Sequence, residues 1–238
     1  MSNRDILKKG LENLGIAVDD KMLNDFNIYR EILVDWNQKM NLTGIEDEKE
    51  VFIKHFLDSV SAVTNDYIKD GLSIIDVGTG AGFPGLPLRI CLRNTKVTLL
   101  DSLNKRINFL NEVIGKLELD NITAIHGRVE EVARNKEYRE CFDVAVSRAV
   151  APLNVLLEYM IPLVKVGGKC ICMKGSNAEE EIETSKNALK KLNAEIETVE
   201  SFELPGTDMK RNIVIVKKIA KTDKVFPRKA GTPSKKPL

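Results

Sequence analysis

The densest group of residues that could do chemistry is the stretch Leu72–Leu88, which reads LSIIDVGTGAGFPGLPL. An acidic residue, Asp76, lies in its short apolar run, and glycines follow at the alternate positions Gly78, Gly80 and Gly82. Because glycine lacks a Cβ atom, a ligand can approach the main chain closely at these positions. The amides before a helix N-terminus are ready hydrogen-bond donors. The stretch therefore predicts a strand, a turn and a helix that together bind a nucleotide-sized cofactor.

Two classes of cofactor are compatible with this turn. Residues 80–85 satisfy the dinucleotide pattern G-x-G-x-x-G, which indicates a nicotinamide or flavin cofactor. The longer frame from Asp76 to Gly82 resembles the D-x-G-x-G-x-G turn of S-adenosylmethionine-dependent methyltransferases, in which Asp76 would approach the methionine end of the cofactor. A tight turn without a ligand is the plain alternative, although alternating glycines weaken packing unless something approaches them. The turn alone leaves both cofactor classes open.

A second acidic residue follows the next predicted strand. The apolar run 97–100 ends in Asp101, which lies 23 residues beyond Gly78. In doubly wound folds an acidic residue about 20 residues after the glycine turn binds ribose hydroxyls. The loop after the following strand, predicted over residues 122–125, reaches the same edge of the sheet, where Val129 could meet an adenine ring. We therefore expect a single cofactor site along this edge.

The elements that position these residues change in kind along the chain. Residues 1–70 carry apolar side chains at helical spacing and predict an N-terminal helical cap. In residues 71–219 short apolar runs alternate with helical patterns, which is typical of a parallel α/β sheet. Gly167 and Gly168 predict a turn before a strand over 169–173, and residues 178–192 predict one charged helix. The runs 196–204 and 212–219, joined by Pro205–Asp208, predict an antiparallel hairpin.

This order of elements resembles the class I, Rossmann-like methyltransferase fold. We expect an α/β domain with a mostly parallel seven-stranded sheet, an antiparallel C-terminal hairpin and the N-terminal helical cap. A dehydrogenase would more often continue into a substrate domain. The predicted organisation is thus a cap over residues 1–70, a cofactor-binding domain over 71–219 and a basic tail over 220–238.

Composition limits the class of protein further. Of 238 residues 43% are hydrophobic and 30% charged, which suits a folded core with a charged surface. No apolar run reaches the length of a membrane span and the N-terminal residues lack a signal-peptide core, so we expect a cytoplasmic protein with no membrane partner. Four cysteines without a C-x-x-C pair and two histidines form no zinc pattern, so no metal is expected. The chain is expected to be a monomer.

Several motifs together resemble one known family. They are IIDVGTGAGFPG (74–85), TLLDSLNKRINFL (98–110), VSRA (146–149), MKG (173–175) and WNQKMNLT (36–43). These motifs are similar to those of the glucose-inhibited division protein B family, the bacterial 16S ribosomal RNA guanine-N7 methyltransferases. The resemblance extends from about Tyr29 to the end of the chain. It implies S-adenosyl-L-methionine as the cofactor and 16S ribosomal RNA, or the small ribosomal subunit, as the partner.

The resemblance and the strand-end pattern together define a set of candidate site residues. The cofactor-binding residues would be Asp76, Gly78, Gly80, Gly82, Phe83, Asp101, Ser102, Leu103, Val129, Glu130 and Arg148. Arg148 would reach either the cofactor or the target base, and the other substrate-binding candidates are Asn41, His55 and Lys174. No catalytic residue is assigned. Guanine N7 has a lone pair and no proton, so its methylation needs no catalytic triad or general base. A structural role remains the plain alternative for His55 and Asn41.

The C-terminal end of the chain is strongly basic. Residues 217–238 contain eight Lys and Arg and one Asp, although the whole chain has a net charge of only +1. Such a basic end predicts a polyanionic partner, with a merely solubilising tail as the alternative. We therefore expect that removing the tail weakens RNA binding and leaves cofactor affinity in place. Two other functions stay open, an NAD-dependent oxidoreductase and a non-catalytic RNA-binding assembly factor.

Overall fold

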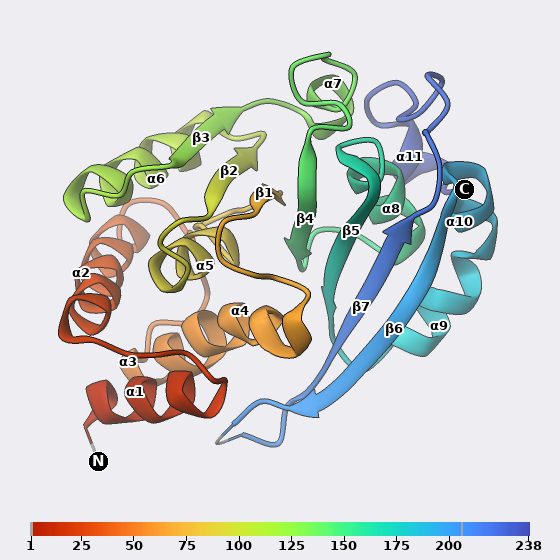
Figure 1. Cartoon of the computed structure of the whole chain (residues 1–238). Helices are drawn as coiled ribbons and strands as arrows, with labels where there is room; N and C mark the ends of the chain where they lie inside the picture. The colour runs from red at the N-terminus through yellow and green to blue at the C-terminus, as the bar shows by residue number, and fades with distance from the viewer. Residues whose placement is uncertain (1, 206) are drawn as a thin grey trace.

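A seven-stranded sheet forms the centre of the molecule (Figure 1). The computed structural model describes residues 2–205 and 207–238, without the side chains of 64–66. In the described chain the strand order is β3-β2-β1-β4-β5-β7-β6. The strands are β1 (Ser73–Val77), β2 (Lys96–Asp101), β3 (Ile122–His126), β4 (Phe142–Arg148), β5 (Val164–Lys174), β6 (Ala194–Glu203) and β7 (Lys210–Lys218).

Strands β1 to β5 pair in parallel, and β7 is antiparallel to both β5 and β6. The predicted mostly parallel sheet with an antiparallel C-terminal pair is therefore confirmed. Part of the turn expected over Pro205–Asp208, namely Gly206, lies outside the described residues.

Helices cover both faces of the sheet, and the N-terminal region is helical as predicted. Residues 48–66 form one helical run that changes from α to π to α to 3-10 geometry. The helical elements are α1 (Asn3–Asn13), α2 (Asp20–Asn37), α3 (Glu48–Glu50), η1 (Val51–Leu57), α4 (Asp58–Val60), η2 (Ser61–Asp66), α5 (Gly85–Cys91), α6 (Asn104–Lys116), α7 (Val129–Val132), α8 (Leu153–Met160), α9 (Ala178–Thr184), α10 (Lys186–Leu192) and α11 (Thr232–Lys235).

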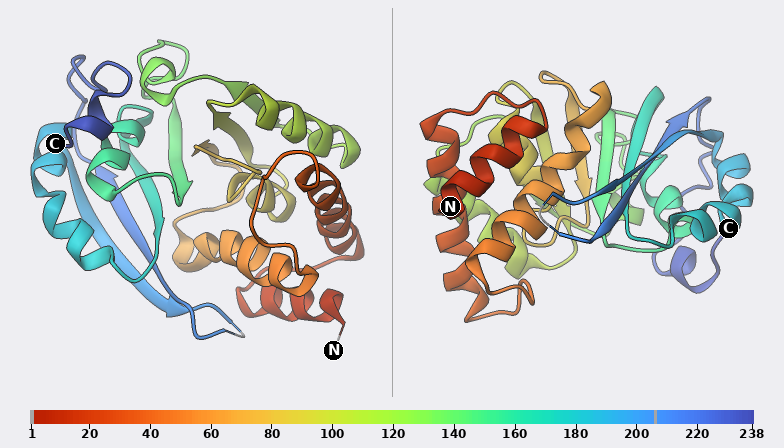
Figure 2. Two further views of the ribbon diagram at one scale, coloured as in Figure 1. Left: turned by 180° about the vertical axis from the view of Figure 1, so that it is seen from behind. Right: turned by 90° about the horizontal axis from the view of Figure 1, so that it is seen from below.

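Alternate strand residues divide the core into two apolar clusters, one on each face of the sheet. Ile74 of β1 belongs to the cluster formed with the N-terminal helices, α5 and α6. Its neighbour Ile75 belongs to the other cluster, formed with α8 and α10. Because β1 is buried on both faces, it is a near-continuous apolar run. Figure 2 shows the N-terminus and the C-terminus at opposite ends of this layered arrangement.

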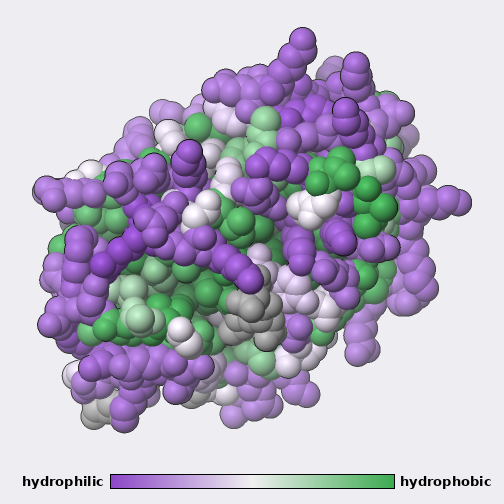
Figure 3. Space-filling view, viewed as in Figure 1, coloured by the Kyte–Doolittle hydropathy of each residue, from purple (hydrophilic) through white to green (hydrophobic). Residues whose placement is uncertain are grey.

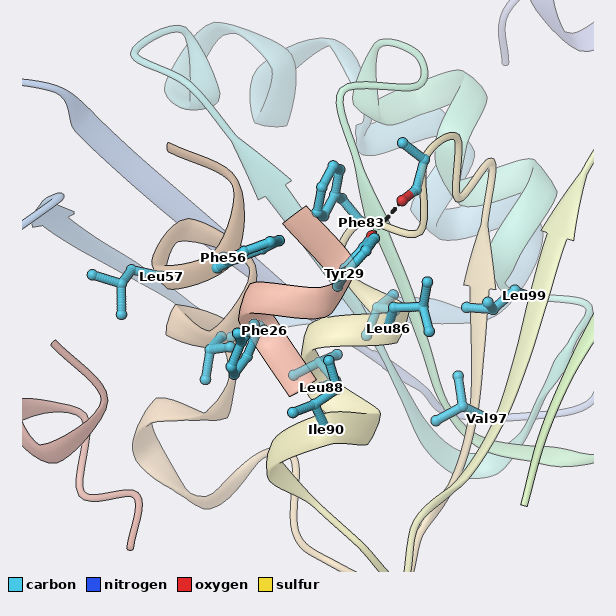
Figure 4. Packing of buried hydrophobic residues seen from close by; sticks show 14 of the residues in the cluster. Phe26, Tyr29, Phe56, Leu57, Phe83, Leu86, Leu88, Ile90, Val97 and Leu99 are labelled. Atoms are coloured by element: carbon cyan, nitrogen blue, oxygen red, sulfur yellow. Dashed lines mark hydrogen bonds between the residues drawn. The ribbon is translucent and has the colours of Figure 1, made fainter. Parts of the chain in front are cut away.

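The N-terminal helices support the glycine turn directly. Tyr29 of α2 packs against Phe56 of η1 and against Phe83 in the turn, with ring centroids 5.1 Å and 5.7 Å away. Its hydroxyl donates a hydrogen bond to the carbonyl of Ala81, drawn as the dashed line in Figure 4. The cap therefore positions the turn by packing and by a hydrogen bond to its main chain.

Two predicted elements differ from the structure. Strand β5 begins at Val164 and continues through Gly167 and Gly168, where a turn was expected. A β-bulge in its pairing with β4 explains the glycines, because a Cβ atom on Gly168 would lie 2.8 Å from the carbonyl oxygen of Asp143. The expected helix over 178–192 is divided at Ser185, whose hydroxyl donates to the carbonyl of Glu181 at 2.6 Å.

The surface in Figure 3 is mostly hydrophilic, with hydrophobic residues gathered in a hollow over the N-terminal helices. None of the helices in the part of the chain that the structure describes is long and apolar enough to cross a membrane.

The contact between Tyr29 and the turn leaves no room for a side chain at Gly82, which can be tested by substitution. Gly82 has a φ of +96°, and a Cβ atom there would lie 2.6 Å from the Tyr29 hydroxyl and 2.5 Å from a Leu86 methyl group. Gly80 also has a positive φ, +60°, but nothing lies within 4 Å of its Cβ position. We expect Gly82→Ala to lower the free energy of unfolding by about 3 kcal/mol and Gly80→Ala by only about 1 kcal/mol. Urea denaturation of the two variants measures this difference, and equal losses would show that Tyr29 does not constrain the turn.

Candidate active site

A cavity of about 380 Å³ opens at the carboxyl ends of β1, β2 and β3. We call it the cofactor cavity. Its walls come from the glycine turn, the loops after β2, β3 and β4, helix α8 and the C-terminal segment. The lining residues are Val77, Gly78, Leu100, Asp101, Ser102, Arg106, Gly127, Arg128, Val129, Glu130, Ala149, Val150, Tyr159, Gly231 and Ser234. This is the edge at which doubly wound folds bind nucleotide ligands.

Asp76 holds the glycine turn from within. One carboxylate oxygen, Oδ2, accepts hydrogen bonds from the Thr79 hydroxyl at 2.6 Å and from the amide of Gly85 at 2.7 Å. The side chain is completely buried, and this burial raises the pKa of Asp76 to about 7 against the opposing effect of the two hydrogen bonds. Its other oxygen, Oδ1, has no partner among the described residues. Asp76 therefore orders the start of α5 and does not line the cavity.

Asp101 joins the turn to the end of β2. Its Oδ2 accepts a hydrogen bond from the amide of Gly80 at 2.9 Å, and its Oδ1 accepts one from the amide of Leu103 at 2.9 Å. Arg106 adds a charged contact of 3.2 Å to Oδ2. These bonds orient the carboxylate at the wall of the cofactor cavity, so Asp101 is placed where the sequence predicted an acidic residue for a ribose.

Gly78 lies where the main chain and the loop after β4 come closest. Its amide donates to the carbonyl of Leu100 at 2.9 Å, and its φ is +70°. A Cβ atom at Gly78 would lie 2.6 Å from a methyl group of Val150. Only glycine fits this approach without moving the loop.

A second cavity, of about 620 Å³, lies beside the first, and we call it the base cavity. It shares Ala149 and Val150 with the cofactor cavity. Its lining comes from the N-terminal helical run, the ends of β4 and β5, helix α9 and strand β7: Lys54, His55, Asp58, Arg148, Ala149, Val150, Ala151, Pro152, Met173, Lys174, Gly175, Glu181 and Arg211. Two cavities that meet at one loop allow a group to pass from a ligand in one to a ligand in the other.

The charges in the base cavity are internally paired. Asp58 accepts hydrogen bonds from Arg148 Nη1 at 3.1 Å and from Arg211 Nε at 2.9 Å. Arg148 also donates to the carbonyl of His55 at 3.3 Å, and its guanidinium lies 4.9 Å from the centre of the Phe83 ring. The planar group of Arg148 is therefore held in one orientation by contacts from three elements.

His55 is a neutral side chain in this network. Burial, and then the positive charge of Arg148, lower the pKa of His55 from 6.5 to about 3. Arg148 Nη2 lies 3.3 Å from His55 Nδ1 and can only donate, so Nδ1 accepts and Nε2 carries the proton. Nε2 then donates to the hydroxyl of Thr43 at 2.7 Å. The imidazole also stacks on Phe83, with ring centroids 4.5 Å apart.

The predicted cofactor-binding residues fall into two groups in the structure. Five line the cofactor cavity: Gly78, Asp101, Ser102, Val129 and Glu130. The other six do not line it. Four of these six make contacts that order the glycine turn or the adjoining loop after β2: Asp76, Gly80, Gly82 and Leu103. Phe83 packs beneath His55, and Arg148 lines the base cavity instead.

The predicted substrate-binding residues are mostly brought together. His55, Arg148 and Lys174 line the base cavity, whereas Asn41 is exposed and lines neither cavity. Lys174 Nζ donates to the carbonyl of Ala151 at 2.6 Å and pairs with Glu181 at 2.7 Å. Sequence reasoning did not single out Asp58, Glu181 or Arg211. The spacing of His55 and Asp58, one helical turn apart, was a signal that could have indicated Asp58.

The basic C-terminal tail, for which the sequence predicted a polyanionic partner, packs against the domain. Gly231 and Ser234 line the cofactor cavity. The expectation that cofactor affinity is independent of this segment stays a prediction, although two residues of the segment line the cavity.

The sheet order and the cavity at its carboxyl edge define a class I S-adenosylmethionine-dependent methyltransferase fold. Among solved structures, a SAM-dependent methyltransferase from Aquifex aeolicus matches with a TM-score of 0.55 and 17% identity over 74% of this chain and 96% of that one. M. jannaschii TYW2 in complex with AdoMet matches with a TM-score of 0.52 and 17% identity over 64% of this chain and 72% of that one. These similarities support the fold alone.

The chain belongs to the GidB family, described as rRNA small subunit methyltransferase G, whose model matches residues 22–214. A protein named ribosomal RNA small subunit methyltransferase G from Alkaliphilus oremlandii is 51% identical over 238 residues, the full length of both chains. One of the same name from Clostridium perfringens is 50% identical over 234 residues, 98% of each chain. The family expected from the motifs is thus confirmed, and these comparisons do not support the oxidoreductase or the non-catalytic binding factor.

The described residues contain no group of three or more His, Cys, Asp and Glu side chains that could hold a metal ion.

The neutral state of His55 predicts a pH dependence of stability. Its pKa is lower in the folded protein than in the unfolded chain, so below about pH 6.5 the unfolded chain binds the proton more readily and the folded state loses stability. The raised pKa of Asp76 acts in the opposite direction, because the folded state then binds the proton more readily. The effect of His55 is therefore isolated by comparing the wild type with His55→Asn, since both contain Asp76.

Between about pH 7 and pH 4.5, the wild type should lose about 2 kcal/mol of unfolding free energy relative to His55→Asn. Urea denaturation at a series of pH values measures this difference. Parallel stability curves for the two proteins would mean that folding does not lower the pKa of His55.

Proposed function

We propose that this protein transfers the methyl group of S-adenosyl-L-methionine to N7 of a guanine in 16S ribosomal RNA. The observation that carries the proposal is the meeting of the cofactor cavity and the base cavity at Ala149 and Val150, in a member of an rRNA methyltransferase family. Methyl transfer between two bound molecules requires such adjacency, with water excluded between them.

The residues of the cofactor cavity fit S-adenosylmethionine. A volume of about 380 Å³ lies within the range of small-molecule sites. Gly78 exposes main chain that a side chain would block, and Asp101 is oriented for ribose hydroxyls. Gly78, Asp101, Ser102 and Val129 would hold the cofactor, which when bound supplies an electrophilic methyl group.

The base cavity provides orientation and not acid–base chemistry. The pKa of His55 is too low for it to donate a proton near neutral pH, and guanine N7 has no proton to remove. Positive charge develops on the purine as its N7 becomes methylated, so an unpaired cation beside N7 would oppose the reaction. Asp58 pairs with both Arg148 and Arg211, and Glu181 pairs with Lys174. Arg148 would donate hydrogen bonds to O6 or to a phosphate, or stack on the base.

The partner is 16S ribosomal RNA, free or within the small ribosomal subunit, and the enzyme acts as a monomer in the cytoplasm. Exposed lysines at residues 224, 229, 235 and 236 offer contacts to RNA phosphates.

Labelled cofactor and under-methylated ribosomal RNA test the activity. We expect one labelled guanine per 16S molecule, located at N7 by mass spectrometry of the digested RNA. Calorimetry should show micromolar affinity for S-adenosylhomocysteine and none for NADH. Gly78→Val should remove both cofactor affinity and methylation, because its side chain collides with Val150 or with the ligand. A folded protein that leaves guanine unlabelled, or that binds NADH alone, would overturn the proposal.

Arg148→Lys tests the assignment of Arg148 to the base. Lysine cannot keep the planar contacts to Asp58, His55 and Phe83, so kcat/KM for RNA should fall roughly a hundredfold. Affinity for S-adenosylhomocysteine should stay within about twofold, since Arg148 lines the base cavity. Arg4→Lys, at an exposed site paired with Asp20, is the matched control and should behave as the wild type. A large loss of cofactor affinity in Arg148→Lys would instead assign Arg148 to the cofactor, as the family resemblance allows.

A further inference from the structure

The C-terminal segment 221–238, which we call the strap, lies against α8 through α11 (Figure 1). Gly231 and Ser234 form part of the cavity wall, together with Tyr159 of α8. Gly231 and Ser234 lie more than 80 positions beyond Ala149 and Val150 in the loop after β4, yet they line the same cavity. Contacts with three parts of the domain hold the strap in this position.

A charged pair fastens the middle of the strap to α8. Glu158 is completely buried, and its carboxylate accepts from Arg228 Nη2 at 2.6 Å, from Nε at 2.9 Å and from the Arg228 amide at 2.7 Å. The same guanidinium donates to the carbonyl of Lys236 at 2.8 Å, which closes the strap on itself. A buried carboxylate without its partner is strongly destabilising, so this pair fixes the strap in the folded protein.

Two arginines between α7 and β4 donate hydrogen bonds to main-chain carbonyls in the first half of the strap. Arg134 donates to the carbonyls of Val225 and Pro227 at 3.0 Å and 2.9 Å. Arg139 donates to the carbonyls of Thr222 and Phe226 at 3.0 Å and 2.8 Å. Hydrogen bonds from charged donors are stronger than neutral ones. The four bonds come from two planar guanidinium groups and therefore fix the main chain of this part of the strap.

The strap also binds the cofactor cavity wall itself. Glu130, expected to contact the cofactor, accepts a hydrogen bond from the amide of Gly231 at 2.8 Å. Ser234 of the strap lines the same cavity as Tyr159 of α8. The contact between Glu130 and Gly231 joins the strap to the core domain within the lining of this cavity. The strap is thus part of the site's construction.

We propose that the strap completes the binding site for the adenosyl part of the cofactor and determines its affinity, with Glu130 and Glu158 as positioning residues. This inference rests on the proposed function. The basic residues of the chain end then have separate roles: the charges of Arg228 and Lys218 are satisfied by Glu158 and Glu140, and the exposed lysines remain for RNA. Cofactor binding and RNA binding therefore depend on different residues of one segment.

Truncation after Ala230 is the decisive variant. It removes Gly231 and Ser234 from the cavity wall and keeps the salt bridge between Arg228 and Glu158 and the contacts of Arg134 and Arg139. We expect the dissociation constant for S-adenosylhomocysteine, measured by calorimetry, to rise at least tenfold, with a melting temperature within a few degrees of the wild type.

Point variants separate attachment from charge. Arg228→Met should weaken S-adenosylhomocysteine binding at least tenfold, whereas Lys224→Met removes the same charge at an exposed position and should bind it as the wild type does. The salt dependence of RNA binding should flatten in Lys224→Met and be unchanged in Arg228→Met. Where Arg228→Met fails to fold, the truncated chain decides.

The outcomes distinguish this inference from the proposed function. If the wild type and the truncated chain bind S-adenosylhomocysteine equally, the role of the strap is overturned and the methyltransferase proposal stands. If the wild type does not bind S-adenosylhomocysteine, both are overturned. A loss of RNA binding alone on truncation would leave the segment as the RNA-binding tail that its charge predicted.

Discussion

The structure depends on how the main chain of the glycine turn is fixed. Gly78, Gly80 and Gly82 all have positive φ angles, a conformation that glycine permits but does not impose. Three side chains from separate elements impose it: Asp76 accepts from the Gly85 amide, Asp101 accepts from the Gly80 amide, and Tyr29 donates to the Ala81 carbonyl. Each of these groups, if left unpaired in the interior, would cost about 1–3 kcal/mol. Both cavities lie against main chain that these bonds hold.

The sequence could predict the parts of the fold and the site that have local signals, and it could not predict those that depend on tertiary contacts. The strand, the glycine turn and Asp101 were predictable because their signals are local, apolar runs and a spacing along the chain. The seven strands and their antiparallel closure followed from the alternation of patterns. The passage of β5 through Gly167 and Gly168 was not predictable, since it depends on the approach of Asp143 from the neighbouring strand. The stacking of His55 on Phe83 was not predictable either, because only the fold brings the two rings together.

The electrostatics of the base cavity suit the chemistry of a nucleophile without a proton. Arg148 and Arg211 share Asp58, whose two carboxylate oxygens accept from one arginine each, so one carboxylate offsets one of the two positive charges. The remaining positive charge lies on groups that are held by their other contacts and cannot swing toward the reacting nitrogen. His55, kept neutral by burial and by Arg148, positions the guanidinium without adding charge. In the proposed reaction, a cavity built in this way would orient a purine by hydrogen bonds and leave its reactivity to its own lone pair.

The basic chain end shows why a count of charges along a sequence does not identify a partner. Arg228 and Lys224 contribute equally to such a count, yet Arg228 meets the buried Glu158 of α8, 70 residues earlier in the chain, and Lys224 is exposed. Internal pairing of this kind depends on tertiary contacts, so no local pattern distinguishes the two residues. Because a buried carboxylate needs a cation and an exposed lysine does not need an anion, only the lysines keep their charge for a polyanion. Under the two proposals made above, the exposed lysines would therefore supply the charge for RNA, whereas the charge of Arg228 serves to fix the C-terminal segment on α8.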